Sequence, residues 1–247
     1  MTPDDNRKIS ADEDYGFDVA GFIHVPQVLS AAEVAACNEA IDVVGRDAGM
    51  LEWPAPHCSP FQALQQHPVL TSYLEALCGS GFVIDRPPAL VADGPEGTVV
   101  PLTNGPPEDR RRLRYANYSG ARESRGVRIF LALAPTGKDG GVVLVTASHN
   151  RSTEPPADFL TGADDLGMTE EPELQAGDVL ICAATVLYGV RGRLGRVMEA
   201  QYVSARTRPT AGYPQVDSPE WATKLTPEQQ AVVGPRTTGR GGTVLSD

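Results

Sequence analysis

The segment that most constrains the fold is Glu173–Ser204, which contains two β-rich runs close together. Asp178–Val186 is a nearly continuous apolar run, typical of a strand buried on both faces, and Val197–Ser204 is the second run. We expect the Gly- and Arg-rich connection between them to place its polar residues at or near one mouth of a sheet: Tyr188, Arg191, Arg193 and Arg196. A guanidinium fork can hold a carboxylate through two hydrogen bonds, so this connection predicts an anion-binding rim. The alternative is a solvated loop.

Composition and charge exclude several classes of protein. A chain of 247 residues, 41% of them hydrophobic, can bury a sizeable core, and we expect one domain. Its net charge of -11 argues against nucleic-acid phosphate or an anionic membrane surface as partner. The basic run Arg110–Arg114 is read as a local patch. No stretch is long and apolar enough to span a bilayer.

The cysteines and the first residues bear on the cellular compartment. Cys37, Cys58, Cys78 and Cys182 form no C-x-x-C pair, and the opening MTPDDNRK contains no apolar signal region. These features predict a reduced, cytoplasmic protein. The sequence carries no signal for an oligomeric state.

Helices are expected in the first third of the chain and near its end. Ser30 and Glu33 form a capping box, and the helix after it carries a buried face of Val34, Cys37, Ala40, Ile41 and Val44. Pro60–Leu77 predicts a second helix, interrupted or entered at Pro68. Thr226 followed by Pro227 marks the start of a short helix.

Short strands separated by turns fill the remainder. They are predicted at Phe82–Ile84, Ala89–Ala92, Thr98–Gly105, Val127–Ala134 and Gly141–Val145, the last two as a hairpin. Glu108–Arg125 is expected to be a long loop, and Arg151–Glu171 an excursion that acts as a lid. The prediction is a mainly β fold with N-terminal helices, a jelly roll or sandwich spanning residues 15–233, between flexible ends at residues 1–14 and 234–247.

Five blocks in this order resemble the phytanoyl-CoA dioxygenase-like (PhyH) family: Gly21–Asp42, Phe61–Gly79, Gly140–His149, Gln175–Val190 and Glu220–Val233. The resemblance covers most of Tyr15–Val233. It implies a cupin-like double-stranded β-helix that uses Fe(II), O₂ and 2-oxoglutarate to hydroxylate a small molecule. In such oxygenases iron sits on two histidines and one carboxylate, which leave positions open for cosubstrate and oxygen.

This chain departs from the family pattern at the metal ligands. None of its four histidines is followed two residues later by a carboxylate. The slots for the His-x-Asp pair best match Thr103 and Gly105, or else Tyr115–Asn117, and the slot for the distal histidine matches Tyr188. A threonine hydroxyl and a neutral tyrosine are poor ligands for Fe(II), so no metal site is predicted at these positions.

The acid-binding half of the family site is a separate question. Arg196 lies eight residues beyond Tyr188, close to where the resemblance implies the basic residue that grips the far carboxylate of 2-oxoglutarate. We therefore predict Arg196, Arg128 and Tyr188 as residues that bind a cofactor or carboxylate, with 2-oxoglutarate as the candidate.

Three functions stay open from the sequence. The first is an iron and 2-oxoglutarate oxygenase with substituted ligands, drawing on His57 or His67. The second is a metal-free protein or enzyme that binds a small carboxylate. The third is a non-catalytic jelly roll that binds a partner through its acidic surface and long loops.

Overall fold

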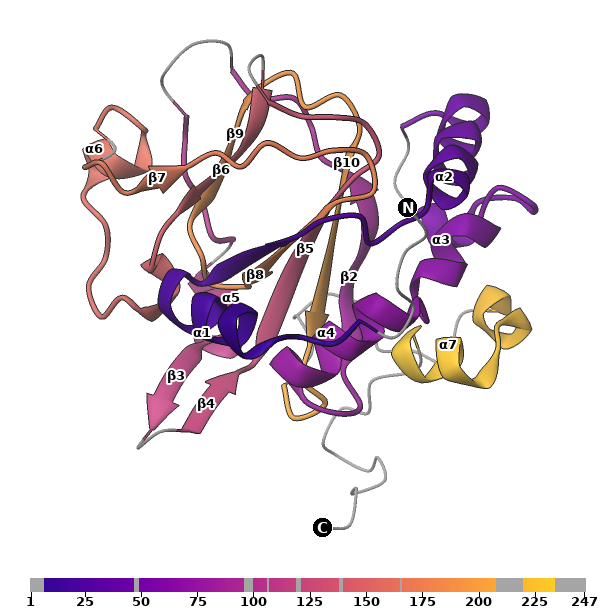
Figure 1. The fold of residues 1–247 in the computed structure, drawn as a ribbon, viewed down its shortest axis with the longest axis horizontal. Coiled ribbons are helices and arrows are strands. Elements are labelled where there is room, and N and C mark those ends of the chain that lie inside the picture. Colours follow the sequence, from indigo (N-terminus) through magenta and orange to yellow (C-terminus); the bar gives the residue numbers. More distant parts are fainter. Residues whose placement is uncertain are drawn as a thin grey trace.

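The computed structural model describes residues 7–46, 49–95, 100–105, 107–118, 121–137, 140–164, 166–207 and 220–233. Two antiparallel sheets form its centre (Figure 1). The larger has the order β1-β8-β5-β10-β2, with bounds β1 Phe22–Val25, β8 Val179–Ala183, β5 Gly126–Ala132, β10 Val197–Val203 and β2 Val83–Leu90. The smaller has the order β7-β6-β9, with bounds β7 Thr169–Glu170, β6 Gly140–Val145 and β9 Tyr188–Gly192. A separate hairpin pairs β3 Tyr115–Tyr118 with β4 Ala121–Ser124.

The arrangement confirms a mainly β fold of the double-stranded β-helix type. Every residue of β5, β6 and β8 is buried, which explains why these strands appear in the sequence as continuous apolar runs. β5 lies between β8 and β10, so the two runs that frame Glu173–Ser204 are the two neighbours of the central strand. The core sits between the sheets and beneath the helices that cover the larger one.

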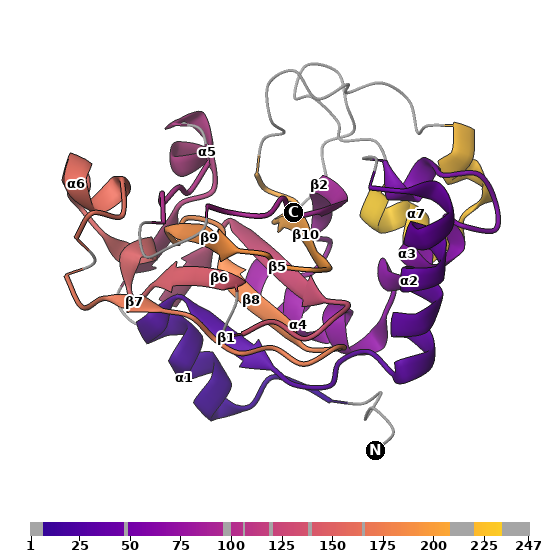
Figure 2. The same ribbon diagram turned by 90° about the horizontal axis from the view of Figure 1, so that it is seen from above.

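Helices cover the outside of the larger sheet and one flank of the molecule. They are α1 Ala11–Ala20, α2 Ala31–Val44, α3 Ser59–Leu64, α4 Pro68–Cys78, α5 Pro107–Arg112, α6 Ala157–Leu160 and α7 Pro227–Val233, with short 3-10 helices η1 Met50–Glu52, η2 Ser148–Asn150 and η3 Glu220–Lys224. α4 packs on β5 and β10. α2, α3 and α7 gather at one end, and α5 and α6 stand at the other (Figure 2).

The predicted helix signals are confirmed. The Ser30 side chain accepts from the backbone of Glu33, and Glu33 accepts from the backbone of Ser30, so α2 begins with the predicted capping box. α4 begins at Pro68, where a missing backbone N–H costs nothing. Thr226 caps α7 through a hydrogen bond from the backbone of Gln229.

Three sequence predictions are corrected along the second half of the chain. The connection after β8 is itself a strand, β9, so Tyr188 at its start and the arginines at and beyond its end do not share one mouth. The predicted loop Glu108–Arg125 contains α5 and the β3–β4 hairpin. β5 and β6 do not form a hairpin, because they belong to different sheets.

Two further differences lie nearer the N-terminus. β2 is one continuous strand that passes through Pro87 and Pro88, which an edge strand tolerates because only one of its sides is paired. α1 occupies part of the predicted flexible stretch 1–14, because Ser10 and Glu13 form a second capping box. The predicted flexible end 234–247 and the first two residues of the predicted strand Thr98–Gly105 lie outside the described residues.

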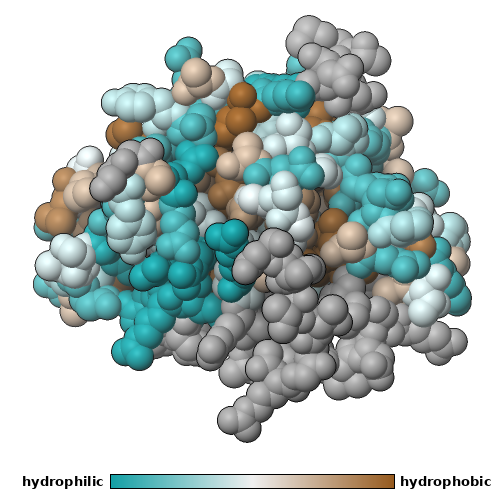
Figure 3. Space-filling view, turned by 90° about the horizontal axis from the view of Figure 1, so that it is seen from below, coloured by the Kyte–Doolittle hydropathy of each residue, from teal (hydrophilic) through white to brown (hydrophobic). Residues whose placement is uncertain are grey.

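Hydrophilic side chains predominate on the face seen from below, with hydrophobic ones in scattered places (Figure 3). Among the described helices, none has the length and apolar character that crossing a membrane requires.

Candidate functional site

The centre of the site is a cation stacked on an aromatic ring between the two sheets. Arg128 and Phe130 alternate with outward-facing residues along β5 and point toward the smaller sheet. The guanidinium carbon of Arg128 lies 4.4 Å from the centroid of the Tyr188 ring, and the Phe130 ring centroid lies 5.2 Å from it. The structure therefore brings together two of the three predicted binding residues, Arg128 and Tyr188.

The Arg128 guanidinium is buried and only partly satisfied. Its side chain is 1% exposed. Nη2 donates to Oε1 of Gln201 at 3.1 Å, and Nε lies 2.7 Å from Oε1 of Glu199. Nη1 is buried and has no hydrogen-bond partner. A charged donor in that position is costly, so it points to a group that the protein itself does not supply.

Charged side chains continue from Arg128 to helix α5. Nε2 of Gln201 donates to Oδ2 of Asp85 at 2.7 Å. Arg112 of α5 donates to both carboxylate oxygens of Asp85, at 2.9 and 2.6 Å. Arg112 also donates to Asp109 at 2.8 Å, and Asp109 accepts from Arg86. This chain of contacts, here called the interior network, ties α5 to strands β2 and β10.

The interior network is electrically balanced. It contains three arginines, Arg86, Arg112 and Arg128, and three carboxylates, Asp85, Asp109 and Glu199. Burial acts to lower the pKa of Arg112, but hydrogen bonds with Asp85 and Asp109 outweigh it, so its pKa is raised. Burial raises the pKa of the Tyr188 phenol, and the Arg128 cation offsets part of that effect. Both groups therefore hold their ordinary protonation states at neutral pH.

Sequence reasoning did not find Glu199, Gln201 or Asp85. A signal was present for two of them, because Glu199 and Gln201 interrupt the apolar run of β10 at alternate positions, which places both on the same face of the strand. Asp85 carried no comparable signal, since it precedes two prolines in a stretch that looks like a turn.

The residues in the predicted ligand slots do lie side by side. Thr103 and Tyr188 form an antiparallel bridge, with backbone N···O distances of 2.7 and 2.8 Å. The hydroxyl of Thr103 accepts a hydrogen bond from the backbone N–H of Gly105 at 3.1 Å. The other match, Tyr115–Asn117, lies in the β3–β4 hairpin outside the two sheets. Of the two matches, Thr103 is the one whose backbone pairs with Tyr188.

These residues do not fit an Fe(II) ion. Thr103 offers a neutral hydroxyl, Gly105 has no side chain, and the Tyr188 ring is occupied by the Arg128 cation, which would repel a divalent metal. Across the described parts of the chain, no three His, Cys, Asp or Glu side chains gather as a metal-binding group.

Arg196, the third predicted binding residue, lies elsewhere. Its guanidinium donates to the backbone carbonyl of Asn38 at 3.2 Å, to Oδ1 of Asn38 at 2.9 Å, and to the carboxylate of Asp42. Asn38 and Asp42 belong to α2, at the end of the molecule where α2, α3 and α7 gather. The reason is again β9, which carries the chain away from Tyr188 before Arg196 is reached.

The histidines have other contacts. His149 is buried and its Nε2 donates to the backbone carbonyl of Asp18 at 3.1 Å. Burial lowers the pKa of His149, with the Asp18 contact opposing it. His67 is buried near Glu33, at 3.6 Å, rather than on the surface. His57 borders a groove beside α2 and α3, so neither of the proposed substitute ligands reaches the Thr103 bridge.

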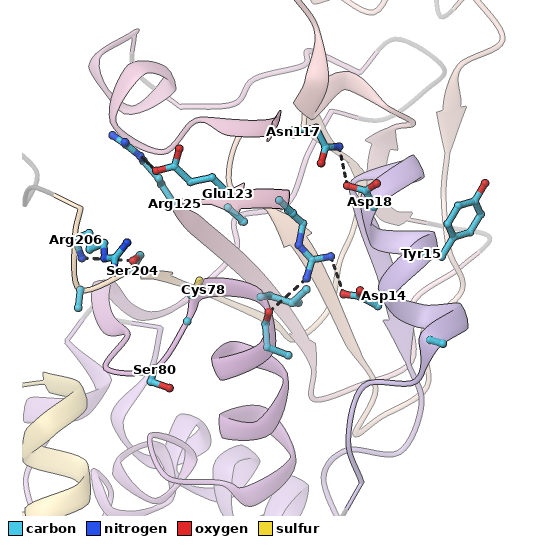
Figure 4. Close-up of a pocket in the computed structure, with 17 residues that line it drawn as sticks. Asp14, Tyr15, Asp18, Cys78, Ser80, Asn117, Glu123, Arg125, Ser204 and Arg206 are labelled. Atoms are coloured by element: carbon cyan, nitrogen blue, oxygen red, sulfur yellow. Dashed lines mark hydrogen bonds and ion pairs between the residues drawn. The ribbon is translucent and has the colours of Figure 1, made fainter. Parts of the chain in front are cut away.

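A larger cleft of about 1290 Å³ lies between α1, the end of α4 and the β3–β4 hairpin (Figure 4). Several of its charged groups already have partners within the cleft. Arg122 contacts Asp14 at 2.6 Å, Arg125 contacts Glu123 at 2.8 Å, and Asn117 donates to Asp18. Among the described residues that line the cleft, none has a buried side-chain polar atom without a hydrogen-bond partner, as Arg128 does.

Comparison with known proteins supports the fold. No protein-family model and no curated protein matches the sequence. Among solved structures, HygX from Streptomyces hygroscopicus with iron bound has a TM-score of 0.65 at 16% identity, over 80% of this chain and 88% of that one. EctD from S. alaskensis with 2-oxoglutarate and 5-hydroxyectoine has a TM-score of 0.60 at 18% identity, over 82% and 78%. SnoK, a non-heme alpha ketoglutarate dependent carbocyclase from nogalamycin biosynthesis, has a TM-score of 0.59 at 18% identity, over 86% of this chain and 91% of that one.

Proposed function

We propose that this chain uses the fold of iron and 2-oxoglutarate oxygenases to bind a small carboxylic acid without iron. The observation that carries the proposal is the buried Nη1 of Arg128, which has no hydrogen-bond partner. A carboxylate oxygen would satisfy this donor with a charge-assisted hydrogen bond, the strong kind of contact that a buried guanidinium requires.

The roles of the neighbouring residues follow from their positions. Tyr188 holds the guanidinium plane by stacking at 4.4 Å, and Gln201 fixes one edge of it. Glu199 is already paired with Arg128 at 2.7 Å, so it competes with an incoming carboxylate. We therefore expect the native protein to bind a small carboxylate with modest affinity, because the Glu199 carboxylate competes with the ligand for Arg128.

The first ligand to test is 2-oxoglutarate, because HygX and EctD have been crystallised with it and have similar folds. Succinate tests whether the keto group contributes. The experiment is isothermal titration calorimetry at pH 7.5 in the presence of EDTA, followed by an anaerobic titration with Fe(II) and an assay for succinate release in air.

Three variants make the experiment specific. Arg128→Gln should abolish binding, and Glu199→Gln should strengthen it, because the competing carboxylate is gone. Arg196→Ala is the matched control, since that arginine contacts Asn38 of α2 and not Tyr188 or Arg128. The double variant Arg128→Gln with Glu199→Gln keeps a neutral polar interior and checks that loss of binding does not reflect unfolding.

The outcomes separate the three functions left open by the sequence. Binding in EDTA that depends on Arg128 supports the proposal. Stoichiometric Fe(II) uptake with succinate release would overturn it in favour of an oxygenase with substituted ligands. If no carboxylate binds with or without metal, the proposal is also wrong, and the non-catalytic interaction protein is favoured.

A further inference from the structure

A second cavity with an excess of positive charge opens beside the Thr103 bridge. It has a volume of about 210 Å³, and its lining includes Arg110, Arg114 and Arg151. Asn104 and Thr185, which also line it, are close in sequence to Thr103 and Tyr188. Arg110 belongs to α5, which stands with α6 at one end of the molecule (Figure 2).

The charge of this cavity is unusual for an acidic protein. Three arginines line it, while Glu154 is the one carboxylate among its described lining residues. The whole chain has a net charge of -11, and Glu123, outside the lining, pairs with Arg114 at 3.2 Å. Arg151 therefore carries the lining charge that no described carboxylate pairs with. Burial lowers the pKa of His149, so this lining residue is neutral at neutral pH and leaves the balance unchanged.

Hydrogen bonds to the backbone hold the Arg151 side chain in place in this cavity. Its Nη1 donates to the backbone carbonyls of Ser148 at 2.8 Å and Thr185 at 3.3 Å, which hold the guanidinium in place but do not neutralise it. Among the described carboxylates, none forms an ion pair with Arg151. Burial lowers its pKa, Glu154 opposes that effect, and the charge of Arg110 adds to it. An anion placed here would offset the cost of burying the Arg151 cation and the repulsion between Arg151 and Arg110.

Arg110 is paired with an exposed carboxylate that a ligand anion can displace. Its partner Glu154 is 73% exposed, so the pair gains little from burial and separates at low cost. Glu154 is thus placed where a ligand anion would bind, and its own carboxylate marks the position that Arg110 recognises. Hydroxyl groups of Ser152 and Thr153 line the same cavity and can donate to an oxyanion.

We propose that this cavity binds a phosphate group, either free phosphate or the phosphate of a larger ligand, between Arg110 and Arg151. A phosphate group carries about 1.5 to 2 negative charges at pH 7 and can accept from two guanidinium forks at once. Part of this charge would pair with Arg151, and the rest would replace the Glu154 carboxylate at Arg110. The cavity is smaller than most pockets for whole drug-sized ligands, which suits a single small group. The proposal does not depend on carboxylate binding at Arg128.

The test uses inorganic phosphate as the probe, in HEPES at pH 7.5, by calorimetry and by thermal unfolding. Sodium chloride at matched ionic strength is the reference, because general screening acts on every surface charge. Phosphate should raise the melting temperature where chloride does not. A simple phosphate monoester, glycerol phosphate, then distinguishes free phosphate from an esterified group by its relative affinity.

Substitutions at Arg110 and Glu154 should change the affinity for phosphate in opposite directions. Arg110→Gln should weaken phosphate binding at least about tenfold, as expected for loss of a charged hydrogen-bonding partner. Glu154→Gln should strengthen it several-fold by removing the competing carboxylate. Arg151→Gln should also abolish binding, but it removes two contacts to backbone carbonyls, so Arg110→Gln provides the decisive result if the Arg151 variant unfolds.

Two controls separate this site from the others. Arg191→Ala removes an arginine paired with Glu171 in the smaller sheet, and should leave phosphate binding unchanged. Arg128→Gln should abolish carboxylate binding while phosphate still binds. The proposal is overturned if phosphate stabilises the protein no more than chloride does, or if Arg110→Gln and Arg191→Ala bind phosphate equally well.

Discussion

The interior network makes a strong prediction about stability, centred on Arg112. Asp85 is fully buried, and the hydrogen bonds that it accepts include two from Arg112 and one from Gln201. The substitution Arg112→Met removes two of these hydrogen bonds and the cation that faces this buried carboxylate. Breaking a buried ion pair from one side costs about 3 to 5 kcal/mol. Arg112 is itself 11% exposed, so we expect the lower end, about 3 kcal/mol.

Urea unfolding followed by the fluorescence of the buried Trp53 measures this change. With a denaturant slope of about 3 kcal/mol per molar urea, the midpoint should fall by about 1 M. The control is Arg191→Ala, which breaks an ion pair whose side chains are 28% and 29% exposed and should cost less than about 1 kcal/mol.

A double-mutant cycle shows whether the cost belongs to the pair. Arg112→Met combined with Asp85→Asn should be about 2 kcal/mol less destabilising than the sum of the single changes, because the second substitution removes the charge left by the first. If Arg112→Met costs no more than Arg191→Ala, or if the single changes simply add, the inference that this ion pair anchors α5 is refuted.

Three further predictions concern local structure. Ser30→Ala should lower the free energy of unfolding by about 1 kcal/mol, because it removes the cap of α2. A loss below about 0.3 kcal/mol would contradict that role. Gly21→Ala should cost about 2 kcal/mol by thermal unfolding, since φ is +88° and a new Cβ would lie 2.4 Å from Nδ1 of His149; an unchanged melting temperature would be inconsistent with this packing. The folded-state pKa of His149 is lowered by burial, so below the ordinary pKa of about 6.5 the unfolded chain binds the proton first and stability falls. In His149→Gln, the loss of stability between pH 7.5 and 5.5 should be shallower, by at most about 1.4 kcal/mol per pH unit, and a slope equal to that of the native protein would show that His149 does not contribute.

Local signals predicted the elements that carry them within a few residues. The capping box of Ser30 and the proline at position 68 fixed the starts of α2 and α4, and long apolar runs located β5 and β8. These features work because they depend on neighbours in sequence. A helix cap or a long apolar run therefore indicates its element whichever distant segment packs against it.

The strand β9 shows why other elements were missed. Its sequence, YGVRG, has two glycines and an arginine, so neither propensity nor periodicity indicates a strand. Pairing with β6 supplies what the local sequence lacks, and Gly140 of β6 permits the close approach, because a Cβ there would lie 2.3 Å from the carbonyl oxygen of Arg193. Tertiary pairing here outweighs intrinsic preference.

The candidate site divides in the same way. Arg128 and Tyr188 were predicted through family resemblance, and the structure brings them into contact. Their partner Glu199, and Asp85 farther along the interior network, join the site through pairings between strands that are distant in sequence. Residue type alone does not reveal that a glutamate inside an apolar run faces a buried arginine. It was the same missed strand, β9, that led to the misplacement of Arg196.

The two prolines in β2 have a consequence for the behaviour of the protein in concentrated solution. β2 is one of the two edge strands of the larger sheet, and such a strand normally offers unpaired N–H and C=O groups to any extended segment nearby. Pro87 and Pro88 have no N–H to donate, and α7 and η1 pack against the same strand. Another molecule therefore finds no continuous ladder on which to add a strand. The motif that resembles a turn in the sequence protects the sheet against intermolecular β-pairing and aggregation.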